Sequence, residues 1–256
     1  MTRVAVTGAT GRMGRTVIEA AEDRDDVEVV MAINRDPDTE RVGGHRVHPA
    51  SDLRRMIRER SPEVVVDFTG PYSAVRYAET CAQTGVAFVS GTTGIDNGHE
   101  ERLRDVAESV PVLHAANFAR GVGVLRDVLQ EAVAALPGYD VEVVETHHRG
   151  KRDAPSGTAR DLLSAVEDAS GGERERRHGR HGESPREDGE IGVHSLRAGS
   201  VTGSHAVVIA GEGEHLRLEH RAGDRSAFAG GALQAAAWIA GRPPGWYELS
   251  DVGGGE

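Results

Sequence analysis

The sequence has little of several residue types, and each shortage excludes a class of protein. Its 256 residues include a single cysteine, Cys81, so no disulfide can form within the chain, which is typical of a reducing compartment. No apolar run is long enough to span a bilayer, and residues 1–8 lack the pattern of a secretion signal. We therefore expect a cytoplasmic protein with no membrane partner, in which Cys81 packs as a small core residue of a helix.

Lysine is almost absent. One of the 30 basic residues is a lysine, Lys151, and the other 29 are arginines, while the formal net charge is -11. This acidity argues against a nucleic-acid partner, because phosphate binding requires a basic face. An acidic surface with little lysine is typical of proteins that stay soluble in high salt, but a GC-rich genome also favours arginine codons. The composition leaves both explanations open.

Aromatic residues make up only 4% of the chain, whereas glycine is abundant, with 33 residues. This combination suits an α/β protein, whose turns need glycine and whose sheets consist of small aliphatic residues. In the first half, helical patterns alternate with strand patterns at residues 3–7, 27–33, 63–68, 86–90 and 112–116. This alternation predicts a doubly wound parallel sheet of the Rossmann type.

The second half of the chain has a different pattern. We expect helices at residues 121–136 and 156–168, and strands at 140–146, 191–197, 205–210 and 215–220. These elements predict a second α+β domain with a mixed sheet, which a helix over residues 227–240 follows. The charged segment 170–190 predicts a solvated loop, with disorder as an open alternative. Its two histidines, His178 and His181, are too few for a metal site, so we expect no metal.

A glycine-rich loop, Gly8–Gly14, follows the first strand and opens the first helix. Its sequence, GATGRMG, allows a tight turn and the close approach of a pyrophosphate, and the helix N-terminus supplies N–H groups. The glycine spacing is looser than in the usual dinucleotide fingerprint, and glycine loops also serve as plain turns. With a strand before it and a helix after it, the loop predicts nucleotide binding through Gly8, Ala9, Thr10, Gly11, Arg12 and Met13.

Ribose recognition is expected about 20 residues after such a loop, at the end of the second strand. Asn34 and Arg35 occupy that position. Asn34 has no charge to repel a 2′-phosphate and Arg35 can pair with one, which favours NADPH, or the use of both NADPH and NADH. The alternative is that Asn-Arg-Asp-Pro is only a turn that ends the strand.

The stretch from Glu145 to Thr158, ETHHRGKRDAPSGT, leaves a strand and enters a helix at PSGT. It holds two adjacent histidines, His147 and His148, and the only lysine, Lys151. With a helix N-terminus that favours anions, these side chains predict a cationic pocket with proton donors. Such a pocket suits the reduction of a small dicarboxylate, whereas two histidines after a strand can also be plain surface residues.

This stretch resembles the signature of the 4-hydroxy-tetrahydrodipicolinate (dihydrodipicolinate) reductase family, and the loop GATGRMG is similar to the cofactor loop of that family. Other motifs match the family in place and order. They are Asp67-Phe68-Thr69, Gly91-Thr92-Thr93-Gly94, Ala115-Ala116-Asn117-Phe118, Arg197-Ala198-Gly199 and the closing helix around Phe228-Ala229. The resemblance extends over essentially the whole chain.

The resemblance implies NAD(P)H-dependent reduction of 4-hydroxy-tetrahydrodipicolinate to tetrahydrodipicolinate with loss of water, in diaminopimelate and lysine biosynthesis. It gives His147 and Lys151 catalytic roles in proton transfer. It implies substrate contacts for His148, Gly157, Thr158 and Thr92. The implied cofactor contacts on later loops are Gly91, Thr92, Thr93, Ala115, Ala116, Asn117 and Phe118.

The domain functions follow from the same resemblance. Residues 1–118 with 227–256 are expected to bind the dinucleotide, and residues 119–226 to bind substrate and to build a homotetramer through their sheet. Asn34 departs from the family, because many members carry an acid there, and the region 36–48 is short.

Two other functions fit parts of the sequence. A different two-domain Rossmann dehydrogenase, such as a homoserine or semialdehyde dehydrogenase, is one. The semialdehyde enzyme needs a cysteine nucleophile in a loop, whereas Cys81 lies in a helical pattern. The other is a nucleotide-sensing protein that has lost catalysis, which would be expected to lack His147 or Lys151.

Overall fold

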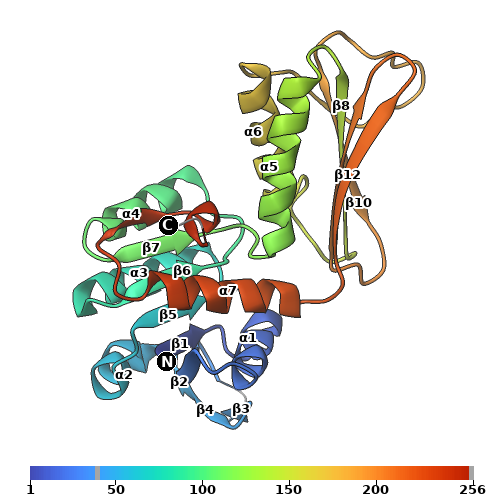
Figure 1. Cartoon of the computed structure of the whole chain (residues 1–256). Helices are drawn as coiled ribbons and strands as arrows, with labels where there is room; N and C mark the ends of the chain where they lie inside the picture. The colour runs from blue at the N-terminus through green and yellow to red at the C-terminus, as the bar shows by residue number, and fades with distance from the viewer. Residues whose placement is uncertain (38–40, 254–256) are drawn as a thin grey trace. The chain divides into compact units, whose positions relative to one another are not determined.

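The computed structural model describes residues 1–37 and 41–253, which divide into two compact units (Figure 1). The first unit joins residues Met1–Phe118 with the chain from Arg225 onward, and the second is continuous from Ala119 to Asp224. Among the residues described, no helix is both long and apolar enough to cross a membrane.

The first unit is built on a sheet with the strand order β13-β7-β6-β5-β1-β2-β4-β3, in which all neighbours run parallel except β3 and β4. The central strands are β1 (Thr2–Thr7), β2 (Val27–Asn34), β5 (Val64–Asp67), β6 (Ala87–Ser90) and β7 (Pro111–His114). The edges are β3 (Arg41–Val42), β4 (His45–Pro49) and β13 (Gly245–Tyr247), which the sequence analysis did not predict. The predicted doubly wound parallel sheet is confirmed.

Helices cover both faces of this sheet (Figure 1). On one face lie α1 (Arg12–Glu22) and α7 (Ser226–Ile239), and on the other α2 (Leu53–Arg60), α3 (Pro71–Thr84) and α4 (Asn97–Ala107). Single 3-10 turns, η1 (Ala50–Asp52) and η2 (Leu249–Asp251), precede α2 and follow β13. Cys81 is fully buried in α3, as predicted.

The second unit has a mixed sheet with the order β12-β11-β8-β10-β9, which confirms the predicted α+β class. Its strands are β8 (Asp140–His147), β9 (Arg176–His178), β10 (Ile191–Arg197), β11 (Gly203–Ala210) and β12 (His215–Ala222). The helices α5 (Arg120–Ala135) and α6 (Gly157–Ser170) pack on one face of it (Figure 1). Side chains alternate along β8, so Glu145 and His147 point toward this helix-covered face and Glu142 toward the other.

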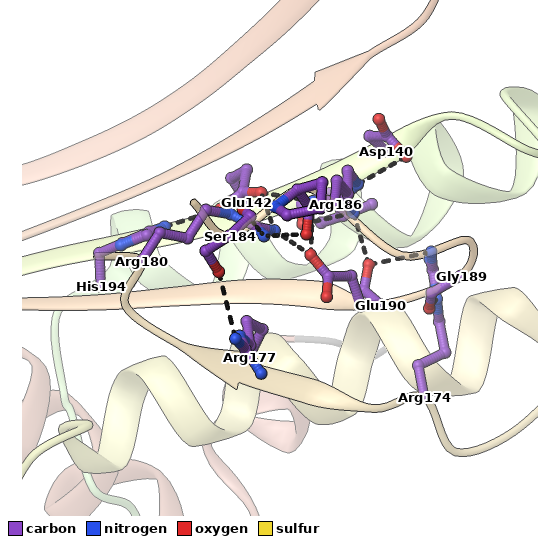
Figure 2. A network of polar contacts seen from close by, with 12 residues as sticks. Asp140, Glu142, Arg174, Arg177, Arg180, Ser184, Arg186, Gly189, Glu190 and His194 are labelled. Atoms are coloured by element: carbon purple, nitrogen blue, oxygen red, sulfur yellow. Dashed lines mark hydrogen bonds and ion pairs between the residues drawn. The ribbon is translucent and has the colours of Figure 1, made fainter. Parts of the chain in front are cut away.

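The segment 170–190 is more ordered than its composition suggests. It contains β9, which pairs in parallel with β10 at the edge of the sheet. Arg176 holds Glu167 of α6 through two hydrogen bonds of 2.8 and 2.6 Å, and Arg180 and Arg186 pair with Glu142 and Glu190 (Figure 2). Most of its side chains are exposed, so it is solvated, but ion pairs fix its course. No group of three candidate metal ligands occurs among the described residues.

Candidate active site

The Gly8–Gly14 loop has a backbone that only glycine permits. Gly8 has a φ of +73°, and a Cβ added to it would lie 2.8 Å from the carbonyl oxygen of Phe68. A Cβ on Gly14 would lie 2.2 Å from the carbonyl oxygen of Gly8. The helix α1 then begins after Gly11 without a side-chain cap. No side chain caps the first N–H groups of this helix, so they can donate hydrogen bonds to an anionic group such as a pyrophosphate.

The position of this loop in the sheet supports the same conclusion. The chain passes from β2 across β1 to β5, so the loops that leave β1 and β5 diverge at a switch point in the strand order. In open α/β sheets, ligands bind at this point beyond the carboxyl ends of the strands. Asn34, the last residue of β2, lies next to it, and the exposed Arg35 follows.

A buried carboxylate connects three loops at this edge. Asp67, at the end of β5, has no exposed surface and accepts hydrogen bonds from four hydroxyls. Thr7 and Thr69 donate to Oδ1 at 2.7 Å each, while Ser90 and Thr92 donate to Oδ2 at 3.1 and 2.7 Å. Burial raises the pKa of Asp67, although these hydrogen bonds oppose the rise. The loops after β1, β5 and β6 are thereby fixed to one another.

Thr92 belongs to this connection. It is 3% exposed, its hydroxyl donates to Asp67, and the same oxygen accepts a hydrogen bond from the Thr69 N–H at 3.1 Å. Its hydroxyl is therefore already committed to the protein. The neighbouring Gly91 has no room for a side chain, because a Cβ would lie 2.1 Å from the ring of Phe68. Thr93 is exposed on the same loop.

The fourth predicted cofactor segment follows β7. This strand ends at His114, so Ala115, Ala116 and Asn117 form a loop of half-buried residues beyond it. Phe118 is 1% exposed and packs edge-to-face on Phe68, with ring centroids 6.0 Å apart. Phe118 is thus a core residue, and only the three residues before it are accessible on this loop.

In the second unit, Glu145 and His147 form a buried pair at the end of β8. Glu145 has no exposed surface, and its Oε2 lies 2.5 Å from Nδ1 of His147. Arg197 of β10 holds the same carboxylate at 2.8 and 2.7 Å, and the Ser156 N–H donates to it at 3.2 Å. Burial by itself would raise the pKa of Glu145, but the hydrogen bonds from His147 and Arg197 outweigh it and lower the pKa to about 2. Glu145 is therefore an anion at neutral pH.

A second histidine packs against this pair. The ring of His205, on β11, lies edge-to-face on His147 with centroids 5.1 Å apart. Its Nε2 is 3.1 Å from the hydroxyl of Ser156, the N-cap residue of α6, which also accepts the Ala159 N–H. Burial, together with the nearby His147, lowers the pKa of His205 to about 3, so its ring is neutral at neutral pH.

The loop from β8 to α6 carries Lys151. Its side chain is 15% exposed, and Nζ lies 2.9 Å from Oδ1 of Asp153. Burial by itself would raise the pKa of Asp153, but the hydrogen bond from Lys151 outweighs it and lowers the pKa. His148, the next residue after His147, is half-buried, and its Nδ1 accepts the Gly150 N–H at 3.2 Å. Gly157 and the buried Thr158 form the first turn of α6.

The start of α6 thus contacts the buried pair through Ser156, and Lys151 lies on the loop between them, where it pairs with Asp153. The partners of His147, which are Glu145 and His205, were not predicted, nor was the contact of Arg197 with Glu145. One signal was present for Glu145, because residues two apart on a strand share a face. Arg197 and His205 are neighbours only through the pairing of β8 with β10 and β11.

Comparisons with known proteins agree with this architecture. Residues 2–118 match the family model "Dihydrodipicolinate reductase, N-terminus", and residues 121–252 match "Dihydrodipicolinate reductase, C-terminus". The chain is 49% identical to the 4-hydroxy-tetrahydrodipicolinate reductase of Haloarcula marismortui, over 98% of this chain and 99% of that one. It is 45% identical to the enzyme of the same name from Natronomonas pharaonis, over 97% and 99%.

A solved structure shares the fold over the same extent. The dipicolinate-bound dihydrodipicolinate reductase from Paenisporosarcina sp. TG-14 superposes with a TM-score of 0.75 at 24% sequence identity, and the match covers 98% of this chain and 99% of that chain. Together with the two family models, these relatives show that the chain belongs to the dihydrodipicolinate reductase family of oxidoreductases.

Proposed function

We propose that this chain reduces 4-hydroxy-tetrahydrodipicolinate to tetrahydrodipicolinate, with loss of water, using NADPH, NADH or both. The activity belongs to diaminopimelate and lysine biosynthesis, the role of its family. The observation that carries the proposal is the buried Glu145–His147 pair, whose carboxylate accepts the N–H of Ser156 at the N-terminus of α6, with Lys151 on the loop that joins β8 to α6. This arrangement supplies proton donors and an anion site together, which the reduction of a dicarboxylate requires.

The first unit, residues 1–118 with 227–256, is assigned to the dinucleotide. The glycine cradle supports this assignment, and the residues that would hold the cofactor are Gly8, Ala9, Thr10, Gly11, Arg12, Met13, Asn34, Arg35, Gly91, Thr92, Thr93, Ala115, Ala116, Asn117 and Phe118. Of these, Thr92 and Phe118 act from inside the protein, by fixing the loops. The reduced nicotinamide supplies the hydride when bound. Asn34 and Arg35 place no carboxylate at the end of β2, which supports the use of NADPH.

The second unit, residues 119–226, is assigned to the substrate. The relative from Paenisporosarcina was solved with dipicolinate, a planar dicarboxylate, and a similar ligand is proposed here. His148, Gly157 and Thr158 are assigned to its carboxylates, since the first turn of α6 offers N–H groups to anions. His147 and Lys151 are assigned to proton transfer, through Nε2 and Nζ.

The same unit is assigned to assembly. A homotetramer is proposed through its five-stranded sheet, one face of which is covered by no helix among the described residues of the second unit. Light scattering at working salt concentration tests this assignment, and a monomer would overturn it. The proposed compartment is the cytoplasm, which a single, buried and unpaired cysteine supports, since it fits a reducing compartment.

A coupled assay with freshly generated substrate and each cofactor in turn tests the activity. Lys151→Arg is the sharpest variant, because arginine keeps the charge but does not release a proton near neutral pH. We expect this variant to bind substrate and to lose turnover by about 100-fold or more. Full activity of Lys151→Arg would show that Lys151 only binds a substrate carboxylate and transfers no proton. Absence of turnover by the wild type with both cofactors would overturn the function.

A further inference from the structure

The carboxylate of Glu145 is saturated with donors. His147 and Arg197 both reach Oε2, at 2.5 and 2.8 Å, and Arg197 and the Ser156 N–H reach Oε1, at 2.7 and 3.2 Å. A carboxylate that is buried and ionised can only accept hydrogen bonds. Nδ1 of His147 must therefore carry its proton toward Glu145 in every protonation state of the ring.

This leaves Nε2 as the nitrogen that can exchange a proton. Gly203 of β11 lies beside it, and a Cβ added there would come within 3.1 Å of Nε2 and 3.4 Å of Cδ2. Such an approach is tighter than an ordinary van der Waals contact. The absence of a side chain at Gly203 therefore keeps the reactive edge of the His147 ring uncrowded.

The charges around His147 oppose one another. Glu145 on β8 is an anion in direct contact, and Arg197 on β10 is a cation on the far side of that anion. The other ionisable groups on this face are His205 on β11, His220 on β12, and Lys151 with Asp153 on the loop that leads to α6. Burial lowers the pKa values of both His205 and His220, which favours their neutral forms. Of the charged groups, Glu145 contacts His147 directly and Arg197 contacts Glu145.

We propose that Glu145 is a positioning residue that fixes the tautomer and the orientation of His147 and places an anion against its ring, and that Arg197 neutralises part of that charge. The proposal rests on the proposed function, because it gives a role to the same histidine. It treats Glu145, His147 and Arg197 as one unit drawn from two adjacent strands, β8 and β10. The register places Arg197 opposite His147 and Ser195 opposite Glu145.

The chain contains a matched control on the other face of β8 (Figure 2). Glu142 also contacts one histidine, with Oε2 2.7 Å from Nε2 of His194, and it also pairs with arginines, Arg186 and Arg180. Its side chain is 29% exposed, whereas that of Glu145 is fully buried. Glu142→Gln therefore removes a similar carboxylate from the same strand without touching His147.

The test compares the pH dependence of kcat in the full-length protein. In Glu145→Gln the ring loses its anion but keeps the cations nearby, so we expect the midpoint of the profile to move to lower pH by about one unit, with kcat lowered about 10-fold to 100-fold. In Arg197→Met the Glu145 carboxylate loses the guanidinium that neutralises it, so the midpoint of the profile should move to higher pH. Glu142→Gln should leave the midpoint unchanged. Midpoints that move in the same direction in both inner variants would overturn the proposal.

A spectroscopic reading separates this proposal from the proposed function. The ¹⁵N resonances of His147, titrated by NMR in the wild type, should show a proton on Nδ1 at all pH values and titration at Nε2. In Glu145→Gln the neutral ring should instead populate both tautomers. If the wild type shows this pattern but no reductase activity, only the function fails. If the wild type is active and Glu145→Gln keeps the Nε2 titration and the midpoint, only the positioning role fails.

Discussion

Strand β8 contributes a glutamate to two clusters of similar composition, one on each face of the sheet. The inner cluster is Glu145 with His147 and Arg197, and the outer cluster is Glu142 with His194, Arg186 and Arg180. Both place a glutamate between a histidine and a guanidinium. The inner one lies under the helices α5 and α6, whereas the outer one stays partly open to solvent and holds the segment 170–190 (Figure 2).

The two clusters therefore differ in the burial of the glutamate more than in residue type. In the inner cluster the carboxylate is desolvated, so each of its hydrogen bonds is strong and a missing partner is costly. In the outer cluster water competes for the same groups, and the side chains can rearrange. The predictions that follow compare equivalent residues of the two clusters.

The largest difference is expected in catalysis. His147→Ala should lower kcat by about 100-fold to 10,000-fold, because it removes the proposed acid–base group, while NADPH binding stays near the wild-type value. His194→Ala should leave kcat unchanged. Steady-state kinetics and the quenching of protein fluorescence by NADPH measure the two effects. Equal activity losses in both variants would remove the distinction between the clusters.

The next difference is expected in stability. Arg197→Ala leaves the buried Glu145 carboxylate without its cation, which should cost about 3–5 kcal/mol of unfolding free energy. Arg186→Ala should cost less, about 1 kcal/mol, because Glu142 is partly exposed and keeps Arg180 as a second cation. Urea unfolding, followed by circular dichroism, measures both. A larger loss in Arg186→Ala than in Arg197→Ala would contradict the assignment of burial as the decisive factor.

Acid should lower the unfolding free energy through the buried His205, which lies on the helix-covered face of the second sheet, between about pH 6.5 and pH 3. The pKa of His205 falls from 6.5 to about 3 on folding. Between these two pH values His205 is protonated in the unfolded chain but not in the folded chain, so protons stabilise the unfolded state. This group is neutral in both states above pH 6.5, and its contribution falls by about 1.4 kcal/mol per pH unit as the pH drops from there toward 3. His205→Asn should therefore flatten the dependence of unfolding free energy on pH over this window. An unchanged slope in that variant would mean that His205 is protonated in the folded protein.

Glu145 makes the unfolding free energy depend on pH in a second range, at lower pH than His205. Its pKa is 4.5 in the unfolded chain and about 2 in the folded chain, so its contribution is complete above about pH 5 and is lost as the pH falls toward 2. Glu145→Gln should remove this part of the acid sensitivity. Urea unfolding at a series of pH values in this range provides the measurement, with Glu142→Gln measured beside it.

The smallest difference is expected from salt. Molar salt screens partly exposed charges, so the destabilisation by Arg186→Ala should shrink toward zero while that of Arg197→Ala persists. Melting curves of the wild type in low and molar salt also separate the two explanations for the arginine-rich, acidic composition. A melting temperature that rises with salt supports adaptation to high salt, and equal stability in both supports codon usage.

Much of this architecture could be predicted from the sequence, because local patterns determine it. The five central strands of the first sheet and the helices between them follow from apolar runs and glycine turns, as at Gly8 and Gly85. The short edge strands could not be predicted in this way. Strand β9 is formed by Arg176–His178, which have no apolar pattern and depend on β10 for pairing.

The site was predictable to the extent that it lies in one segment. His147 and Lys151 stand four residues apart, whereas Arg197 lies 50 residues beyond His147 and meets it only across the strand pair β8–β10. Thr92 illustrates the opposite limit. The resemblance assigns it to both the substrate and the cofactor, and the hydrogen bond from its hydroxyl to Asp67 could not be predicted, because Asp67 lies 25 residues earlier in the chain.

The placement of α7 has a consequence for how the protein is made. This helix belongs to the first unit although it follows the second in the chain, and its Ala229, Leu233 and Ile239 complete the core around the sheet. Gly231 allows the closest approach, since a Cβ there would lie 1.8 Å from the carbonyl oxygen of Phe118. The ribosome therefore releases the whole second unit before the first one can close. We expect the second unit to fold first, and a fragment that ends at Phe118 to aggregate, because it lacks the helix that covers its core.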